Sequence, residues 1–410
     1  MTPPPTDPAD ERLELFLCAG EPSGDATGAE LARELQQLTP VHLYGVGAAQ
    51  MREAGVELLH DSTEWSAIGL APALRRVPSL NVRCVQLRAL ICRRRPDLVV
   101  LIDFGAFNVR LARAIKRHCA GQPILYYFPP ASWSRGGRNL APVVQVVDYV
   151  AAPFPWCEEV YAAHGAKARW VGHPLVDLAA RTPDRATTRR QLGLSPEATV
   201  IGIVPGSRRS EIEMILPHVL AGVQQACAGR PRPQIVVSRA RTISEDLIRP
   251  HLQTSAWPEA PLVEGVNGVF SAADLAVVTM GTATLEGCIL GCPMLAVYRS
   301  TAVGHAQFQL FRPRVTFLAM PNVIADRRIV PEIIPWRYAA ETIGAELRRL
   351  LEHPDELARM RADLLAAAAQ LGAPGASRRA AQAVLDAVRG HWDRGRGGEP
   401  QAEGRPAGAP

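Results

Sequence analysis

A Gly-Ser-Arg turn is the first feature of this sequence that could do chemistry. Gly206, Ser207 and Arg208 follow an apolar run over residues 198–204 and precede an amphipathic helical pattern. Such a turn exposes free backbone N–H groups, the helix that follows places the positive end of its dipole there, and Arg208 adds a fixed cation. The turn is therefore a candidate anion site.

A second turn of the same kind follows the strand-like run over residues 274–278. It consists of Gly281, Thr282 and Ala283, and two such turns in one α/β half suggest a bound diphosphate. Glu286 lies about one turn into the helix that Thr282 opens, so its carboxylate could reach sugar hydroxyls while the helix N-terminus holds phosphate. The alternative for Glu286 is a solvated helix residue.

A carboxylate closes an apolar strand pattern in the first part of the chain. Asp103 comes directly after the run Leu-Val-Val-Leu-Ile at residues 98–102. A carboxyl group at the end of a buried strand is expected to have a raised pKa, which suits a general base. The alternative is that Asp103 caps the following helix.

The segment after the first apolar run holds three further polar candidates. Glu21 precedes the expected helix start and has no obvious helical role, which makes it a second candidate for catalysis. Ser23 is a good N-cap and Asp25 is favourable in a first helical turn, so a structural role competes with acceptor binding for both. Asn322 follows a proline in a later loop and could hold a ligand, although a lone asparagine is also typical of a turn.

Sequence motifs for metals and cofactors are absent. We find no His-Glu-x-x-His, no P-loop, no Cys-x-x-Cys and no Asp-x-Asp beside the two anion turns. We therefore expect neither a metal nor a cofactor. Arg208 and the helix N-termini can neutralise a leaving diphosphate instead.

The composition is that of an ordinary globular protein. The chain has 410 residues, of which 47% are hydrophobic and 21% charged, and its net charge is +5. This length accommodates two domains, and the small net charge argues against a dedicated nucleic-acid binder. The arginines between residues 75 and 95 could meet an anionic membrane surface, where each basic residue contributes about 1 kcal/mol, or they could form a solvated helix face.

The cysteines and the N-terminus bear on the compartment. The eight cysteines are scattered, mostly within apolar runs, as small buried hydrophobes would be. The N-terminus is not a signal peptide, and no apolar run approaches the roughly 20 residues of a membrane-spanning helix. We expect a cytoplasmic protein, either free or attached to a membrane from that side.

The elements that must position these residues alternate between strand and helix patterns, which predicts βαβ units with parallel sheets. Ligands bind outside the carboxyl ends of the strands in such sheets, and most of the candidates fall there. We expect two Rossmann-like domains, at residues 12–175 and 196–389, joined by a linker at residues 176–195. The second domain includes the C-terminal helices. Residues 1–11 and 390–410 are expected to be disordered.

Taken together, these motifs resemble the lipid-A-disaccharide synthases, inverting glycosyltransferases with two Rossmann-like, doubly wound α/β domains facing across a cleft (GT-B type). The similarity runs from about residue 15 to about residue 389. It is carried by short motifs in matching order: Ala19–Asp25, Ile102-Asp103, Phe107-Asn108, Gly172–Asp177, Pro205–Arg208, Glu211-Ile212, Gly281–Ala283, Glu286, Cys292–Met294, Tyr298-Arg299 and Pro321-Asn322.

The resemblance implies an enzyme of lipid A biosynthesis that transfers 2,3-diacylglucosamine from its UDP derivative to 2,3-diacylglucosamine 1-phosphate and releases UDP. The second domain would hold the UDP-sugar and the first the acylated acceptor. Asp103 would match the family's base, and Glu21, Arg208, Glu286 and Asn322 its polar active-site residues. On the acceptor side we place Ser23, Asp25, Asn108 and Trp133. The cytoplasmic face of the inner membrane and a second copy of the chain are further partners to test, and nucleic acid is not expected.

The sequence departs from the family mainly on the acceptor side. Pro22 replaces an alanine, Ala106 an aspartate and Arg328 a glutamate, and residues 129–135 keep only one of two tryptophans. Two alternatives therefore stay open: a transferase that acts on a different lipid or small acceptor, and a UDP-N-acetylglucosamine 2-epimerase, which also has two Rossmann halves. A binding protein without catalytic activity fits least, because Asp103 and Arg208 are both present.

Overall fold

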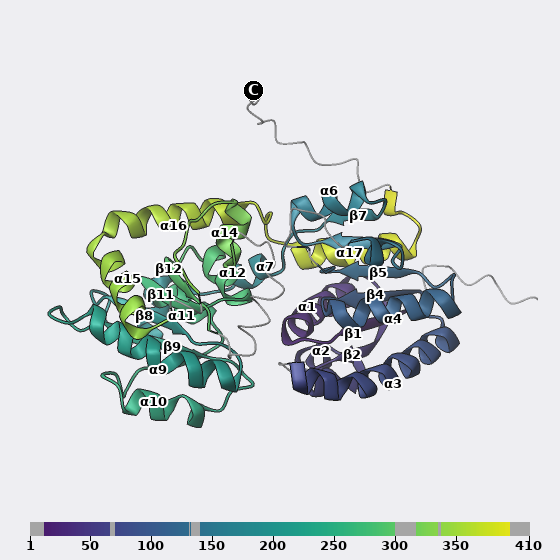
Figure 1. Cartoon of the computed structure of the whole chain (residues 1–410). Coiled ribbons are helices and arrows are strands. Elements are labelled where there is room, and N and C mark those ends of the chain that lie inside the picture. The colour runs from purple at the N-terminus through teal and green to yellow at the C-terminus, as the bar shows by residue number, and fades with distance from the viewer. Residues whose placement is uncertain are drawn as a thin grey trace, which may run out of the picture. The chain divides into compact units, whose positions relative to one another are not determined.

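The chain folds into two compact units, each with its own parallel sheet (Figure 1). The structure, a computed structural model, describes residues 12–65, 70–130, 132, 140–299, 317–334 and 338–393. The first unit comprises Met1–Gly172 and Ser377–Pro410, and the second comprises His173–Ala376. The predicted disordered N-terminus and most of the predicted disordered tail lie outside the described residues.

Seven parallel strands form the sheet in the described part of the first unit, in the order β3-β2-β1-β4-β5-β6-β7. They are β1 (Leu13–Ala19), β2 (Val41–Gly47), β3 (Glu57–Asp61), β4 (Leu98–Ile102), β5 (Ile124–Tyr127), β6 (Tyr149–Ala152) and β7 (Lys167–Trp170). The strand order reverses between β1 and β4, which pair directly. In a doubly wound sheet such a reversal opens a crevice at the carboxyl ends of the strands.

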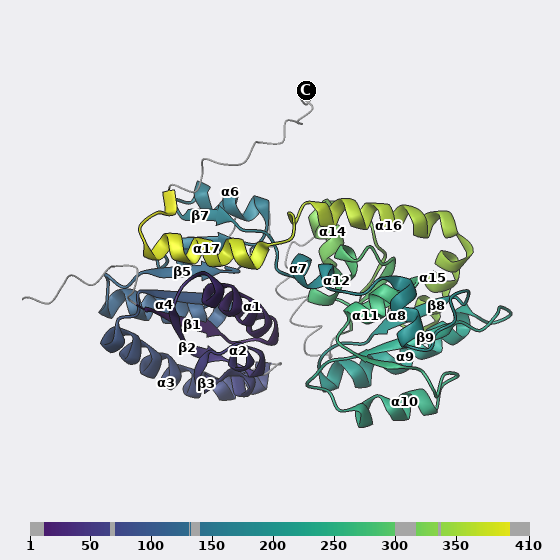
Figure 2. The ribbon, with the colours of Figure 1, turned by 180° about the vertical axis from the view of Figure 1, so that it is seen from behind.

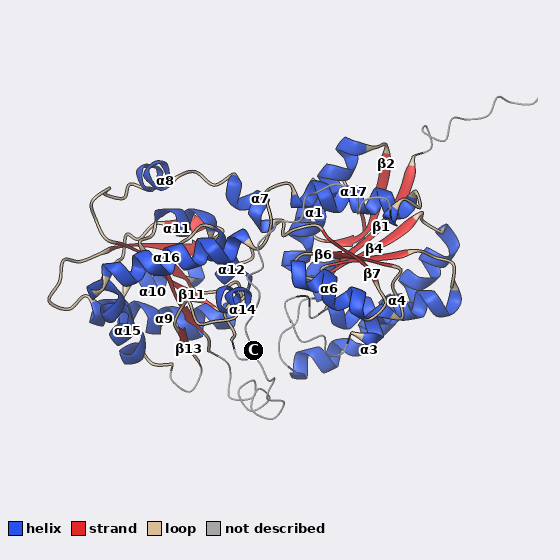
Figure 3. Cartoon of the chain, turned by 90° about the horizontal axis from the view of Figure 1, so that it is seen from above, coloured by secondary structure: helices blue, strands red, loops and turns tan. Residues whose placement is uncertain are grey.

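Helices cover both faces of this sheet, as the view from above shows (Figure 3). They are α1 (Pro22–Leu38), α2 (Ala49–Glu53), α3 (Leu70–Arg94), α4 (Gly105–His118), α5 (Ala141–Val144), α6 (Pro155–Ala163) and α17 (Ala376–Val388), with a 3-10 turn at Ser62–Trp65. Because successive side chains of a strand point to opposite faces, Leu15 and Leu17 of β1 pack in the core beneath α1 and α17. Both faces are buried, which explains why β4 reads as a continuous apolar run.

The last helix corrects the predicted domain boundaries. We expected the C-terminal helices to belong to the second half as far as residue 389, but α17 packs on the sheet of the first unit (Figure 2). Arg169 of β7 donates a 2.6 Å hydrogen bond to Asp386 and lies 4.5 Å from the centre of the Trp392 ring. Trp392 is itself buried, so the ordered chain extends past the predicted start of the tail at residue 390.

The second unit repeats the architecture. In its described part, six parallel strands lie in the order β10-β9-β8-β11-β12-β13. They are β8 (Val200–Val204), β9 (Gln234–Arg239), β10 (Leu262–Glu264), β11 (Leu275–Thr279), β12 (Met294–Val297) and β13 (Glu332–Ile333). The order reverses between β8 and β11, and these are the two strands that precede the predicted anion turns.

The predicted linker is an integral part of this unit. Residues 176–195 lie mostly in two helices, and Arg189 is buried among partners from the rest of the unit. Its guanidinium donates to Asp274 at 2.8 Å and to the carbonyl of Ala272 at 2.9 Å. The helices of the unit are α7 (Leu175–Ala180), α8 (Arg185–Gln191), α9 (Arg209–Ala226), α10 (Arg249–Gln253), α11 (Asn267–Ala272), α12 (Thr282–Ile289), α14 (Met320–Ala325), α15 (Ala340–Glu352) and α16 (Pro354–Ala369), with a 3-10 turn at Glu245–Leu247.

Two of the cysteines differ from the prediction of scattered buried thiols. Cys92 in α3 and Cys119 at the end of α4 form a disulfide, with 5.7 Å between their Cα atoms. The other cysteines are free, and all of them except Cys227 are buried. Among the described residues, none of the helices combines the length and the hydrophobicity that a membrane span requires.

Candidate active site

The loops that follow β1 and β4 meet at the strand-order reversal of the first unit. Because β1 and β4 run parallel in register, with Ala19 opposite Ile102, the residues after both strands lie at the same edge. The Ser23 hydroxyl donates a hydrogen bond to Asp103 Oδ2 at 3.1 Å, across 80 positions of sequence. Gly20 permits this approach, since a Cβ atom there would lie 2.1 Å from the ring of Phe104.

The backbone at Asp103 is held in an unusual conformation. Asp103 and Phe104 both have positive φ, at 50° and 48°, which is costly for residues with a side chain and clusters at functional sites. Two buried groups fix the turn through the Asp103 carbonyl, which accepts 2.8 Å hydrogen bonds from Asn108 Nδ2 and from the Tyr126 hydroxyl. The N-cap of α4 is Phe104, so Asp103 is not the helix cap that the alternative prediction proposed.

The electrostatics of Asp103 suit a base. Burial raises the pKa of its carboxyl above the ordinary value, and hydrogen bonds from Ser23 and from the Phe104 N–H partly offset that increase. The side chain still reaches solvent in part. A carboxylate that is partly desolvated, fixed in place and accessible can accept a proton from a bound hydroxyl.

Two of the predicted acceptor-side residues are buried and form hydrogen bonds with backbone groups of the protein itself. Asp25 is 3% exposed, and its carboxylate accepts hydrogen bonds from three backbone N–H groups of the turn into α2, at distances between 2.7 and 3.1 Å. Asn108 is fully buried and donates to backbone carbonyls, including that of Cys18 at 3.2 Å. Both residues shape the loops beside Asp103, and the structure leaves neither facing an acceptor.

The remaining candidates of the first unit are placed as follows. Glu21, and not Ser23, is the N-cap residue of α1; its side chain is exposed at the same edge as Asp103. Ser23 is the second residue of the helix, and its hydroxyl is directed to Asp103 instead of the helix end. Trp133 lies outside the described residues.

The first anion turn of the second unit already binds a carboxylate. Gly206 has a φ of 120°, and the turn leads into α9, whose N-cap is Arg208. Glu211 Oε2 accepts the Ser207 N–H at 2.8 Å, and Glu211 Oε1 accepts a hydrogen bond from the Arg208 guanidinium. The absence of a side chain at Gly206 is required, because a Cβ atom would lie 2.4 Å from Glu211 Oε2. In this structure the donors of the turn bind the carboxylate of Glu211, and a bound diphosphate stays a prediction.

The second anion turn is open. Gly281 is the N-cap of α12 with a φ of 149°, and space surrounds the position of a Cβ atom there. Gly281 and Thr282 are exposed, whereas Ala283 is partly buried. Thr284 braces the turn from within, donating to the Gly281 carbonyl at 2.8 Å and accepting the Met320 N–H at 3.2 Å. Within the described part of the chain, no atom beyond Gly281 and its two neighbours in sequence lies within 4 Å of a Cβ position at Gly281, beside the positive end of α12.

Glu286 lies on the first turns of the same helix. Burial raises the pKa of its carboxyl to about 7, although part of the side chain remains exposed. At neutral pH this group is therefore poised between its two protonation states. Strongly perturbed acids in such positions are candidates for binding or catalysis, which favours the functional interpretation of Glu286 over a solvated helix residue.

Asn322 differs from the prediction of a direct ligand contact. It is fully buried, and Oδ1 accepts the N–H groups of Ile329 and Val330 at 2.7 and 2.9 Å. Nδ2 donates to the Val330 carbonyl and to Glu332 Oε1, both at 2.9 Å. Because these bonds use both polar atoms, Asn322 ties α14 to the segment that leads into β13, and its amide is not directed at a ligand.

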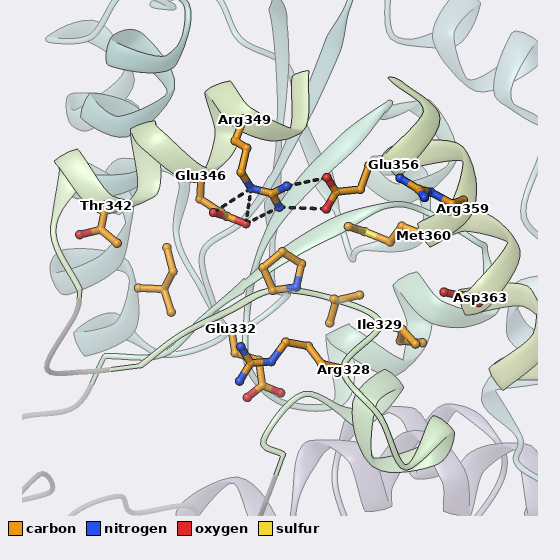
Figure 4. Close-up of a pocket in the computed structure, with 13 residues that line it drawn as sticks. Arg328, Ile329, Glu332, Thr342, Glu346, Arg349, Glu356, Arg359, Met360 and Asp363 are labelled. Atoms are coloured by element: carbon orange, nitrogen blue, oxygen red, sulfur yellow. Dashed lines mark hydrogen bonds and ion pairs between the residues drawn. The ribbon is translucent and has the colours of Figure 1, made fainter. Parts of the chain in front are cut away.

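A cavity of about 520 Å³ also opens in the second unit, between the residues before β13 and the helices α15 and α16 (Figure 4). Much of its charged lining is engaged in ion pairs: Arg349 pairs with both Glu346 and Glu356, and Asp363 pairs with Arg327. None of the site residues predicted from the sequence lines this cavity.

Sequence analysis missed two residues of these loops. Tyr126 lies within an apolar strand pattern that gave no sign of its hydrogen bond to the Asp103 carbonyl. Glu332 accepts hydrogen bonds from the N–H groups of Leu318 and Ala319 as well as from Asn322. The only sequence signal for Glu332 was its position, ten residues after Asn322. Among the described residues, no three His, Cys, Asp or Glu side chains cluster as metal ligands would.

Two doubly wound units, one with a carboxylate and the other with anion turns at its strand-order reversal, define a protein of the GT-B type. Solved structures of this class share the fold. The chain is 14% identical to the UDP-GlcNAc 2-epimerase of Neisseria meningitidis bound to UDP-GlcNAc, with a TM-score of 0.59 over 91% of this chain and 99% of that one. For MurG of Acinetobacter baumannii the identity is 14% and the TM-score 0.54, over 92% and 100% of the two chains.

The family follows from the sequence itself. The model of the Lipid-A-disaccharide synthetase family matches residues 15–387, and the lipid-A-disaccharide synthase of Geobacter sulfurreducens is 34% identical over 91% of this chain and 96% of that protein. The chain therefore belongs to the lipid-A-disaccharide synthetase family, the glycosyltransferases of lipid A biosynthesis. The predicted resemblance and the predicted enzyme class are confirmed.

Proposed function

We propose that this chain transfers 2,3-diacylglucosamine from its UDP derivative to 2,3-diacylglucosamine 1-phosphate and releases UDP. The observation that carries the proposal is Asp103, a partly desolvated carboxylate fixed at the strand-order reversal of the first unit. Family membership supplies the reaction class, and the substrates are those implied by the sequence motifs.

The second unit is the proposed nucleotide-binding half. The diphosphate would lie at the N-terminus of α12, where Gly281, Thr282 and Ala283 offer backbone N–H groups. Arg208 would add a cation, and the carboxyl of Glu286 would accept hydrogen bonds from ribose hydroxyls. The bound UDP-GlcNAc of the Neisseria meningitidis epimerase, which shares the fold, supports a UDP-sugar as the donor.

The first unit is the proposed acceptor half. Asp103 would remove the proton of the acceptor hydroxyl as its oxygen attacks the anomeric carbon of the donor. The bond from that carbon to the diphosphate breaks, UDP leaves with the electron pair, and the proton remains on Asp103. A single displacement of this kind inverts the anomeric configuration. Glu21, exposed at the same edge, is the second polar group proposed to contact the acceptor.

A product assay tests the proposal. The full-length chain, incubated with the acylated UDP-sugar and the acylated sugar 1-phosphate, is expected to release UDP and form a disaccharide 1-phosphate that mass spectrometry detects. Interconversion of plain UDP-N-acetylglucosamine with its 2-epimer, without transfer, would replace the proposal with an epimerase. If UDP were released only when a different acceptor was supplied, the proposed donor would stand and the proposed acceptor would be wrong. Accumulation of both acylated substrates in cells depleted of the protein would support the proposed pair.

We also propose that α3 meets an anionic membrane surface from the cytoplasmic side. Val82 and Val85 are 58% and 56% exposed on this helix, and Arg93, Arg94 and Arg95 are exposed at its end. Flotation with vesicles containing anionic lipid should retain the wild type and lose a V82D/V85D variant. Binding that is equal for both variants would contradict the proposal. Arg75 and Arg76, part of the predicted basic segment, have side chains outside the described ones.

A further inference from the structure

The disulfide between α3 and α4 lies near the amino ends of the strands of the first sheet, whereas the candidate site lies at their carboxyl ends. Cys92 is in the last turn of α3, which leads into β4, and Cys119 is the C-cap residue of α4, which leads into β5. Both helices therefore end at the amino ends of the strands, whereas Asp103 follows the carboxyl end of β4. The intervening helix α4 has 14 residues, or about 21 Å at 1.5 Å per residue.

Both cysteines of this pair are also more exposed than most of the other cysteines. Cys92 and Cys119 are both partly exposed. Five of the other six cysteines are buried. Burial raises the pKa of each of these six thiols, to about 12 for Cys157, Cys288 and Cys292. Because the thiolate is the reactive form, a raised pKa makes the six other thiols less reactive toward disulfides.

The charges around the pair favour reaction when it is reduced. Arg88, one turn before Cys92, donates a 2.8 Å hydrogen bond to Nε2 of His118, the neighbour of Cys119. Arg93 and Arg94 follow Cys92 directly and are exposed. Basic residues next to the two cysteines in sequence favour a thiolate, whereas the negative ends of the two helix dipoles disfavour it. Because Cys92 and Cys119 are partly exposed, a small disulfide can reach the pair from solvent.

We propose that Cys92 and Cys119 form a thiol–disulfide exchange site whose co-reactant is a low-molecular-weight disulfide such as oxidised glutathione. One protein thiolate attacks a sulfur of the glutathione disulfide, giving a mixed disulfide and releasing one glutathione thiolate. The second protein thiolate then attacks the protein sulfur and releases the other glutathione. In total, two protein thiols lose two electrons and two protons, and one glutathione disulfide is reduced to two thiols.

The segment between Cys92 and Cys119, which the disulfide closes into a loop, carries the candidate base. The cysteines are 27 positions apart, and the loop between them contains β4, Asp103 and α4. A cross-link of this length stabilises chiefly by restricting the unfolded chain. Oxidation should therefore raise the thermal stability. Because the disulfide lies at the opposite ends of the strands from Asp103, oxidation should leave the chemistry at Asp103 unchanged.

Mass spectrometry of the full-length protein in glutathione buffers of stepped redox ratio tests the exchange. After acid quenching, the protein is unfolded in denaturant so that the alkylating reagent reaches buried thiols. Cys92 and Cys119 should become protected from alkylation together as the buffer becomes oxidising, while the other cysteines are alkylated at every ratio. The C92S variant should retain Cys119 as a mixed disulfide with glutathione. Independent protection of the two residues, or equal protection of Cys227, would overturn the proposal.

Thermal melts supply the second readout. The oxidised wild type should melt several degrees above the reduced form, and the difference should vanish in C92S and in C119S. C227S, which removes a partly exposed thiol outside the pair, is the matched control and should keep the difference. Equal melting temperatures for the two forms of the wild type, or a lost difference in C227S, would contradict the assigned pair.

Discussion

The hydroxyl of Ser23 donates a hydrogen bond to Asp103 across the reversal point of the first sheet. This bond opposes the effect of burial on the carboxyl: desolvation raises the pKa of Asp103, and the Ser23 bond lowers it by stabilising the ionised form. Ser23 therefore sets how much of the candidate base is ionised at a given pH.

Replacement of Ser23 should shift the pH dependence of the reaction. A base must be ionised to act, so activity falls as the pH drops through the pKa of Asp103. Ser23→Ala removes a bond that lowers this pKa, and the acid limb of kcat/KM should move to higher pH. Ser23→Thr keeps a hydroxyl and is the control. An acid limb at the wild-type pH in the alanine variant would show that Ser23 does not tune the base.

Replacement of Asp103 should reduce turnover far more than nucleotide binding. Asp103→Asn keeps the size of the side chain and removes the basic oxygen, so kcat should fall by roughly 10²- to 10⁴-fold, the typical contribution of a general base. UDP affinity by calorimetry should stay near the wild-type value. Near-normal turnover would remove Asp103 as the base, whereas loss of the fold would assign it a structural role.

The first anion turn should bind UDP in competition with Glu211. Arg208→Ala removes a charge-assisted contact worth roughly 1.5–3 kcal/mol, so UDP affinity should fall about 10- to 150-fold.

Glu211→Gln should have the opposite effect. The variant loses the negative charge that occupies the donors of Ser207 and Arg208, and UDP affinity should rise about fivefold, as expected for about 1 kcal/mol of relieved repulsion. Calorimetry checks both variants. Weaker binding in Glu211→Gln would instead mean that Glu211 orients Arg208 for the diphosphate.

UDP binding should depend on pH near neutrality through Glu286. Its pKa is raised to about 7 by burial, and a ribose hydroxyl that donates to the carboxylate favours the ionised form. Affinity should therefore rise as the pH increases through 7, with proton release in calorimetry. The Glu286→Gln variant should lose this pH dependence of UDP affinity. It should keep any pH dependence that comes from titration of UDP itself. The same pH dependence in both proteins would exclude Glu286 from the nucleotide contact.

Asn322 should affect stability before it affects binding. Asn322→Ala leaves the buried N–H groups of Ile329 and Val330 without their acceptor, and each unsatisfied buried group costs about 1–3 kcal/mol. We expect a lower melting temperature, with UDP affinity of the folded fraction nearly unchanged. Normal melting with weakened UDP binding would restore the direct contact predicted from the sequence.

Much of the architecture could be predicted because its signals are local. Apolar runs such as the one before Asp103 become buried strands, and a glycine turn before an amphipathic pattern becomes a helix start with free N–H groups. These rules placed the anion turns of Arg208 and Gly281 at strand ends, where the structure has them.

The errors concern partners that lie far apart in sequence. Asp25 looked available because nothing in its own segment shows that it accepts N–H groups of residues 48–51. The amphipathic pattern of α17 shows that one face is buried, and it does not show which sheet buries it. The pairing of Cys92 with Cys119 likewise depends on two helices packing side by side.

The return of α17 to the first unit has a consequence for biosynthesis. The core beneath this helix contains Ala380, Val384 and Trp392, which are translated after every residue of the second unit. Domains ordinarily complete their folding in the order of synthesis. Here the second unit, a continuous stretch from His173 to Ala376, has its whole sequence available while the first still lacks its last core helix. Translation therefore supplies the last helix of the N-terminal sheet only after the second unit has been synthesised, so we expect this sheet to be the later of the two to be fully covered.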